Sequence, residues 1–320
     1  MGRAADHKGG SVSGPSKEVD MFSKKRVMAS MAILLVLATA LLGCGAANTT
    51  TAPATTTSSS ITPEEIVANA VSAFQSVNTI TMSVNMNVGM AIVGGKQPMT
   101  IQVSGDANGS VDLDETQMRM TMDLNVDLPV VGKQQTSTEM YVVDNWAYMK
   151  ISVPEMADQW LKTQLTPTIW EQQNQVDKQI EMLKNAVKVT SLGEETVNGV
   201  DCYVLSIEPD AEALSAFVKS QIPQGLGTDS LQNIDLAQFF NSITMKEWIG
   251  KGNYLPAKMD MTMSLDLSPE SVGAQQSDFA NMTMDMQVQG TYTDYNQPVT
   301  VVLPPEAANA KEATTPTTAP

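Results

Sequence analysis

Methionine is the residue type in this chain whose spacing could do chemistry. The chain holds 22 Met against 16 aromatic residues, and Met recurs at every second position in three segments and at every fourth position in another. A thioether is a soft ligand for Cu(I), and it is also a flexible, polarizable apolar group that adapts to irregular partners. The candidate ligand-binding residues are Met82, Met86, Met90, Met120, Met122, Met261, Met263, Met284 and Met286.

The spacing favours an apolar lining over a metal site. Residues i and i+2 on one strand face are about 6.6 Å apart, at roughly 3.3 Å per residue, so one ion would need Met from neighbouring strands. The recurrence over four segments suits a surface that surrounds a lipophilic ligand, and we favour that interpretation. A Met-rich packed core without a ligand and a Cu(I) site are the alternatives, and we predict neither a metal nor a cofactor.

An oxygen-rich segment from Asp106 to Asp114 resembles a calcium loop in its alternating polar residues. Calcium loops carry Gly at the sixth position and a bidentate Glu at the twelfth. Here Gly109 stands at the fourth position and Gln117 at the twelfth. The pattern therefore indicates the polar face of a strand and its turn.

The chain contains few residues of the types that catalyse reactions. The one His is His7, and no His follows it, so Ser-His-Asp and Cys-His catalysis and His-ligated zinc are excluded for the remainder. Cys202 lies in a predicted strand and reads as a small buried thiol. The acids of the long strands fall on polar positions, and none is marked as having a raised pKa: Asp123, Asp127, Asp260, Asp266 and Asp285. We predict no catalytic residue and no enzyme.

The charge distribution excludes nucleic-acid binding. After residue 43 the chain carries 13 basic and 32 acidic side chains. Phosphate backbones and anionic lipid head groups are bound through Lys and Arg, so this excess of acid would repel them.

The elements that must position the Met are mostly strands. Met82 to Met90 alternate with polar residues at a period of two, and the same alternation returns three times: Met118 to Leu128, Met259 to Leu267 and Met282 to Val288. Turns are predicted at Gly94-Gly95, Asp144-Asn145, Asn198-Gly199 and Gly250 to Asn253. Helices are predicted at Thr62 to Val77, Thr166 to Val187, Asp210 to Val218 and Leu231 to Phe240, and the segment Trp160 to Leu165 could be a helix end or a strand. The fold class is therefore α+β: a large curved antiparallel sheet, or half-barrel, of about ten strands capped by about four helices.

The N-terminal region has the sequence features of a secretory signal peptide. Lys24, Lys25 and Arg26 precede a sixteen-residue apolar run, Val27 to Leu42, and Cys44 follows it. Residues 1–43 are thus a signal peptide in which residues 1–20 suit no basic n-region, so we expect translation to start at Met21. Residues 44–60 form a Thr/Ser-rich tether, 61–305 a single domain and 306–320 a disordered tail.

Two resemblances extend this interpretation. Leu41-Leu42-Gly43-Cys44 resembles the bacterial lipobox, in which the Cys is acylated and becomes the first residue of the mature chain. The helix running into Met82, the hairpin Val197 to Leu205 and the strand pair Trp248 to Met263 resemble the LolA/LolB carriers and the LppX/LprG-type lipoproteins. That resemblance implies an unclosed antiparallel barrel, lidded by helices, that holds acyl chains or lipoproteins.

The expected function follows from these features together. We expect an extracytoplasmic lipoprotein, held on the outer face of the cell membrane by acylated Cys44, that binds or carries a lipid or acyl chain. A non-enzymatic sensor or interaction lipoprotein with a packed core is the alternative, and the ligand and any envelope protein partner are not specified by the residues.

Acylation of Cys44 is directly testable. We expect the wild-type chain to carry a lipid mass and to fractionate with membranes, and Cys44→Ser to stay unprocessed. Mass spectrometry and cell fractionation measure both. A wild type that carries no lipid mass would show that the lipobox interpretation is wrong.

Overall fold

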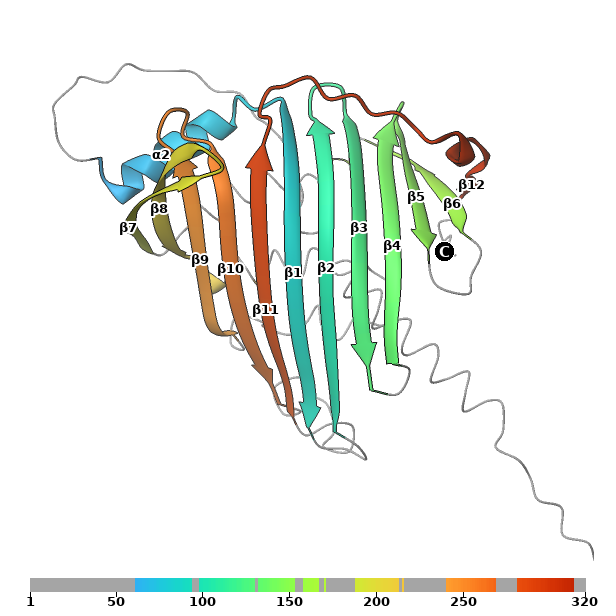
Figure 1. Cartoon of the computed structure of the whole chain (residues 1–320), viewed down its shortest axis with the longest axis horizontal. Coiled ribbons are helices and arrows are strands. Elements are labelled where there is room, and N and C mark those ends of the chain that lie inside the picture. The colour runs from blue at the N-terminus through green and yellow to red at the C-terminus, as the bar shows by residue number, and fades with distance from the viewer. Residues whose placement is uncertain are drawn as a thin grey trace, which may run out of the picture.

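The computed structural model describes residues 61–93, 98–129, 132–152, 158–166, 170, 188–212, 215, 240–268 and 281–313. These residues build one twelve-stranded sheet, shown in Figure 1, in the order β12-β6-β5-β4-β3-β2-β1-β11-β10-β9-β8-β7. The strands are β1 Thr79–Val93, β2 Met99–Asp112, β3 Gln117–Leu128, β4 Gly132–Val143, β5 Trp146–Ser152, β6 Gln159–Gln164, β7 Lys188–Val197, β8 Val200–Glu208, β9 Phe240–Gly250, β10 Pro256–Leu267, β11 Asn281–Thr293 and β12 Lys311–Glu312. All neighbours pair antiparallel except β12, which pairs parallel with β6.

The sheet joins two consecutive meanders at its centre. β1 to β6 follow one another on one side, and β7 to β11 on the other. The seam is the pairing of β1 with β11, which runs from Thr81 opposite Thr293 to Val93 opposite Asn281. Two segments about 200 residues apart in sequence therefore lie side by side, as the cyan and red strands of Figure 1 show.

The predicted curvature and the predicted long strands are confirmed, whereas the prediction of about four helices is not supported by the described residues. α2 (Pro63–Phe74) and the 3-10 turn η2 (Pro305–Asn309) are the helical elements with bounds in the described ranges. The fold is mainly β rather than α+β. The helices predicted at 166–187, 210–218 and 231–240 lie largely outside the described residues, and Phe240 begins β9. The ambiguous segment 160–165 is strand β6 up to Gln164.

The turns that the residue types predict are confirmed wherever they fall on described residues. Asp144 and Asn145 both have positive φ, at 52° and 61°, and connect β4 to β5. Asn198 and Gly199 have φ of 50° and 82° and connect β7 to β8. Two-residue hairpins with positive φ at both positions match the strand twist, and Asn, Asp and Gly tolerate that conformation. The turn predicted at Gly94-Gly95 lies outside the described residues.

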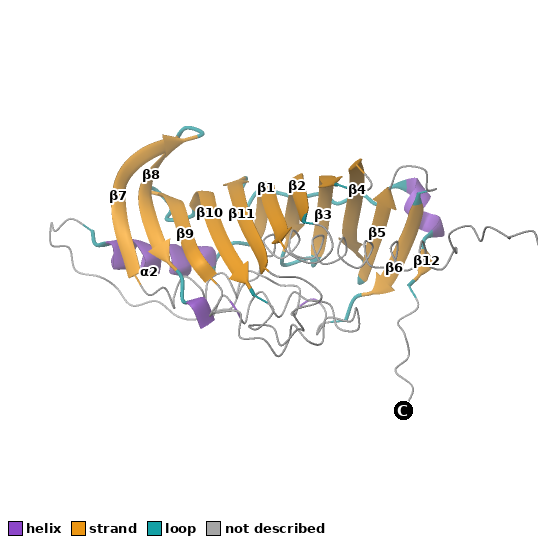
Figure 2. Cartoon of the chain, turned by 90° about the horizontal axis from the view of Figure 1, so that it is seen from below, coloured by secondary structure: helices purple, strands orange, loops and turns teal. Residues whose placement is uncertain are grey.

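The sheet is open and curved, and different elements of the fold lie on its two sides. Figure 2 shows it nearly edge-on, with α2 on one side and the β7–β8 hairpin bending toward the other. The bend coincides with a register shift between Ser191 and Gly193, where Gly193 has a φ of 112°. On the hairpin side Glu195 accepts a 2.7 Å hydrogen bond from the Trp248 indole, and Lys258 lies 4.4 Å from the same ring. The hydrogen bond between Glu195 and Trp248 holds the hairpin over β9.

Sheet pairing continues beyond the domain boundary expected at Pro305. η2 follows Pro304 directly, and Lys311 and Glu312 pair with Leu161 and Lys162 of β6. Ala307 is fully buried. The fold therefore includes residues up to 313 that the sequence analysis assigns to the tail.

The start of α2 gives a stability prediction. The Thr62 hydroxyl accepts from the Glu65 amide at 3.2 Å, and the Glu65 carboxylate accepts from the Thr62 amide at 2.9 Å. We expect Thr62→Ala to lower the free energy of unfolding by about 1 kcal/mol because an amide of the first turn loses its acceptor. Thr62→Ser keeps the acceptor and should behave as wild type in chemical denaturation. Equal loss in both variants would show that the capping box does not stabilise the helix.

Candidate functional site

The pairing register gathers the methionines onto one face of the sheet, which we call the Met face. Residues directly opposite one another in adjacent strands share a face. Met263 of β10 lies opposite Met286 of β11, and Met90 of β1 lies opposite Met284. Met120 of β3 lies opposite Met140 of β4. The four Met segments of the sequence, on β10, β11, β1 and β3, thus lie on one continuous surface, in which β2 connects β1 to β3.

All nine candidate residues lie on the Met face and belong to, or pack against, one apolar cluster. The buried ones are Met82, Met86, Met120, Met122, Met261, Met263 and Met286, and the half-buried ones are Met90 and Met284. Ile66 and Ala70 of α2 belong to the same cluster, so the helix covers part of this face. The structure therefore brings every predicted residue together on one surface. Its arrangement suits apolar contact rather than redox or acid–base chemistry.

The Met face offers little to a hard metal ion. Among the described residues no group of three or more His, Cys, Asp and Glu side chains lies close enough to hold one. Cys202 is buried on the opposite face with Val204, Trp248 and Ala257, and burial raises the pKa of its thiol. A buried thiol of raised pKa is a poor nucleophile, and the interpretation of Cys202 as a packing residue agrees with this position.

The opposite face carries the acids that the alternation assigns to it. Asp123, Asp127, Asp266 and Asp285 are exposed, and Asp260 is half-buried and accepts a 3.0 Å hydrogen bond from the Gln289 amide. Asp106, from the segment that resembles a calcium loop, lies within β2 and accepts from the Asn85 amide at 2.8 Å. These carboxylates form part of a solvated strand surface, as their spacing predicts.

A buried carboxyl group lies on the Met face instead. Glu247 of β9 is 6% exposed and lies opposite Met259 of β10 and Leu205 of β8. Its same-face neighbours along β9 are Met245 and Ile249, and both are buried. Burial raises the pKa of the Glu247 carboxyl to about 8, so it is largely protonated at neutral pH.

Within the part of the chain that the structure describes, three buried side-chain oxygens on this face have no hydrogen-bond partner. They are Oε2 of Glu247 and the Oγ1 atoms of Thr136 and Thr138 on β4. Thr138 lies opposite Met122, and Thr136 lies opposite Leu124. The three oxygens thus lie toward the two sides of the apolar surface, on β9 and on β4. A buried polar group without a partner costs free energy, so each of them favours an occupant that hydrogen-bonds to it.

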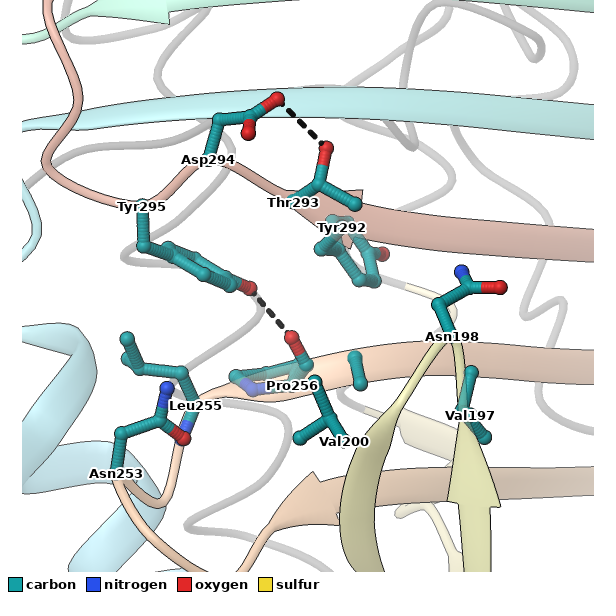
Figure 3. Close-up of a pocket in the computed structure, with 11 residues that line it drawn as sticks. Val197, Asn198, Val200, Asn253, Leu255, Pro256, Tyr292, Thr293, Asp294 and Tyr295 are labelled. Atoms are coloured by element: carbon teal, nitrogen blue, oxygen red, sulfur yellow. Dashed lines mark hydrogen bonds between the residues drawn. The ribbon is translucent and has the colours of Figure 1, made fainter.

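A small pocket lies where strands β10 and β11 meet the tip of the β7–β8 hairpin (Figure 3). It has a volume of about 280 Å³ and is lined by Val197, Asn198, Val200, Asn253, Leu255, Pro256, Ala257, Tyr292, Thr293, Asp294 and Tyr295. The Tyr295 hydroxyl donates to the Pro256 carbonyl at 2.8 Å, and the Thr293 hydroxyl donates to Asp294 at 3.0 Å. Ligand sites usually measure about 300 to 1,000 Å³, so this pocket is small for a lipid. The Met face is the better candidate site.

Comparison with known proteins places the chain in a family. A model of the family of unknown function DUF6612 matches residues 62–312, which covers most of the chain and nearly all of the described fold. The chain belongs to the DUF6612 family. No curated protein matches it significantly.

Several solved structures resemble the DUF6612 fold at low sequence identity. LprF from Mycobacterium bovis is 14% identical, with a TM-score of 0.42 over 76% of this chain and 96% of that chain. The lipoprotein LppX from Mycobacterium tuberculosis is 11% identical, with a TM-score of 0.36 over 75% and 97%. A putative outer membrane lipoprotein-sorting domain from Vibrio parahaemolyticus is 11% identical, with a TM-score of 0.19 over 74% and 94%.

No helix within the described ranges of this DUF6612 chain has the length and apolar character needed to cross a membrane. Cys44, the signal peptide and the tether lie outside the described residues.

Sequence reasoning missed Glu247, and the prediction that no acid has a raised pKa is wrong at this residue. The signal was present in the alternation Ile243, Met245, Glu247 and Ile249, which assigns the glutamate to the apolar side of β9. Thr136 and Thr138 gave a weaker signal because Thr is common on either face of a strand.

The buried carboxyl predicts an unusual pH dependence of stability. Between its ordinary pKa near 4.5 and about 8, the folded chain holds a proton that the unfolded chain has lost. Stability contributed by this group therefore falls as pH rises through that window, at up to about 1.4 kcal/mol per pH unit. We expect Glu247→Gln to remove this slope, so the variant should gain stability relative to wild type between pH 5 and pH 8. Denaturant titrations at the two pH values measure the difference.

The control for this measurement is Glu208→Gln, at an exposed carboxyl near the end of β8. It should keep the wild-type dependence. If Glu247→Gln also keeps it, the Glu247 carboxyl is not protonated in the folded chain at neutral pH.

Proposed function

We propose that this chain is an extracytoplasmic lipoprotein, anchored through acylated Cys44, that binds or carries a lipophilic molecule against the Met face. The observation that carries the proposal is the composition of that face. Across β10, β11, β1 and β3 its described side chains are almost entirely apolar, and a third of the buried apolar cluster is Met.

Methionine is the side chain that best fits a ligand of variable shape. It is unbranched, has three rotatable bonds and carries a polarizable sulfur, so it adjusts to irregular partners. Branched residues hold fewer rotamers, and they would fix the surface in one shape. A Met-rich face therefore supports binding of acyl chains that differ in length or unsaturation.

The anchoring part of the proposal rests on the sequence. Cys44 follows a basic n-region and an apolar run, and residues 45–60 contain small and polar side chains that suit a tether. Acyl chains on Cys44 would hold the chain at a membrane surface, where lipophilic ligands are available. The acidic charge of the chain argues against binding through anionic lipid head groups.

A specific observation favours the alternative, a surface lipoprotein with a packed core and no ligand. Met82, Met86 and Met263 are only 3 to 4% exposed, which is also the burial of an ordinary core. Substitution by a larger side chain separates the two functions because a packed core has no room for it.

The test uses Met120, Met261 and Met284, which lie inside their strands on the Met face. In a packed core each Met→Trp variant should lose about 1 to 3 kcal/mol, and each Met→Ala variant about 2 to 5 kcal/mol. On a ligand-binding surface we expect at least one Trp variant to keep its stability while it lowers the binding of Nile red, because the indole takes the space of the dye. Denaturant midpoints and dye titrations on the six variants measure both effects.

Gln287→Trp is the matched control, since Gln287 is exposed on the opposite face of β11. It should change neither stability nor dye binding. Strong destabilisation by all three core Trp substitutions, together with a wild type that binds no dye, would contradict the carrier function and favour the packed-core alternative.

A further inference from the structure

The Met face carries a carboxyl oxygen, Glu247 Oε2, that is buried and has no hydrogen-bond partner among the described residues. The charged groups nearby are engaged elsewhere: Lys258 packs on the opposite face over the Trp248 ring, which Glu195 also contacts. The carboxyl is therefore not explained by an ion pair or by a structural hydrogen bond.

A carboxyl in this environment is unfavourable for folding alone. Its neighbours in register are Met259 and Leu205, and those along the strand are Met245 and Ile249. A buried polar group without a partner costs more than an apolar group of similar volume at the same position. Methionine at position 247 would complete the apolar surface without that cost.

The charge of the surrounding surface restricts what could pair with the carboxyl. The described residues that face the same side as Glu247 on β8, β9, β10, β11 and β1 include no Lys or Arg. Lys251, which follows β9, lies 5.3 Å from the Tyr203 ring on this side, but it is already ion-paired with Glu194. An anionic group placed there would find no unpaired cation among these residues and would lie beside a carboxyl. A hydroxyl or an ammonium group would donate to the unpaired oxygen.

We propose that Glu247 anchors the polar end of the lipophilic ligand, and that this end is a hydrogen-bond donor, a hydroxyl or an amine, rather than an anion. The inference rests on the proposed function, because it assigns the head-group chemistry of a ligand bound to the Met face. The alkyl part lies along the methionines of β10 and β11, and the polar end meets the carboxyl on β9.

Thr138 provides an internal comparison. It lies in the same cross-strand row as Glu247, which runs through Met259, Gly290, Val84, Ala107 and Met122. Six strand spacings separate the two residues, roughly 29 Å along the sheet at about 4.8 Å per spacing. A ten-carbon chain is much shorter than this, so a decyl ligand anchored at Glu247 does not reach Thr138.

The experiment compares three decyl compounds on the full chain carrying Cys44→Ser, which has no acyl group of its own. Displacement of Nile red by 1-decanol, decylamine and decanoate at pH 7 gives their relative affinities. We expect wild-type affinity for decanol and decylamine to exceed that for decanoate by about tenfold or more, which corresponds to one good hydrogen bond or ion pair. Tighter binding of decylamine than of decanol would indicate an ion pair between the amine and Glu247. Tighter binding of decanol would indicate a neutral hydrogen bond to Glu247.

The variants assign the preference to one residue. Glu247→Met should bind Nile red as wild type does and bind the three decyl compounds with affinities within about threefold of one another. It should also be more resistant to denaturant than wild type, which a structural carboxyl would not allow. The amide of Glu247→Gln keeps both a hydrogen-bond donor and an acceptor. This variant should therefore keep the wild-type affinity for decanol and should not bind decylamine more tightly than decanol. Thr138→Val should keep the wild-type selectivity.

The outcomes separate this inference from the function on which it rests. A wild type that binds neither Nile red nor any decyl compound overturns both. Dye binding with equal affinities for the three compounds overturns the head-group inference alone. The same holds if selectivity survives in Glu247→Met or disappears in Thr138→Val.

Discussion

The pairing of β1 with β11 is the interaction on which the rest of the structure depends. It joins two meanders whose strands are otherwise local in sequence, and it does so over thirteen consecutive residue pairs. Because cross-strand partners share a face, this register continues the apolar rows of β10 and β11 directly into β1 and β2. A shift of one residue would turn Met82 to Met90 outward and divide the Met face into two unconnected halves. The price of this arrangement is a pairing between distant segments, which slows folding relative to local contacts.

An apolar face of this width must be shielded from water, and the curvature of the sheet shields it only in part. A sheet of twelve strands that does not close leaves two edges, here β7 and β12, and a concave side that must be shielded from water. α2 covers the end of that side near β7 to β10, and its capping box fixes where the helix begins. The β7–β8 hairpin bends the other way and covers Trp248, so that end of the sheet is enclosed on both faces. A surface that is wide, apolar and Met-rich is the physical basis of the proposed binding of a lipophilic ligand.

Glu247 shows how stability and binding conflict on such a surface. The same burial that raises the pKa of its carboxyl also removes water that would otherwise hydrogen-bond to it. Replacing it by an apolar residue would favour folding, while keeping it gives the β9 side of the surface a directional group among non-directional contacts. Apolar packing alone discriminates weakly between ligands of similar shape, whereas a buried polar group left unpaired by the wrong ligand discriminates strongly. The acids of the opposite face, by contrast, are solvated and carry no such constraint.

The sequence by itself determined the strands, their inward residues and several turns. Alternation at a period of two is a local property, so Met82 to Met90 and Met259 to Met263 could be assigned to a buried face without knowledge of their partners. The Asp144-Asn145 and Asn198-Gly199 turns followed from the few residues that tolerate positive φ. Which strands lie next to one another was decided only by the tertiary structure, because the β1–β11 seam and the parallel pairing of β12 join segments that carry no local signal for each other. The same holds for Glu247. Its position in the alternation could be read from the chain, but its isolation among Met259, Leu205 and Met245 depends on the neighbours that the sheet order places around it.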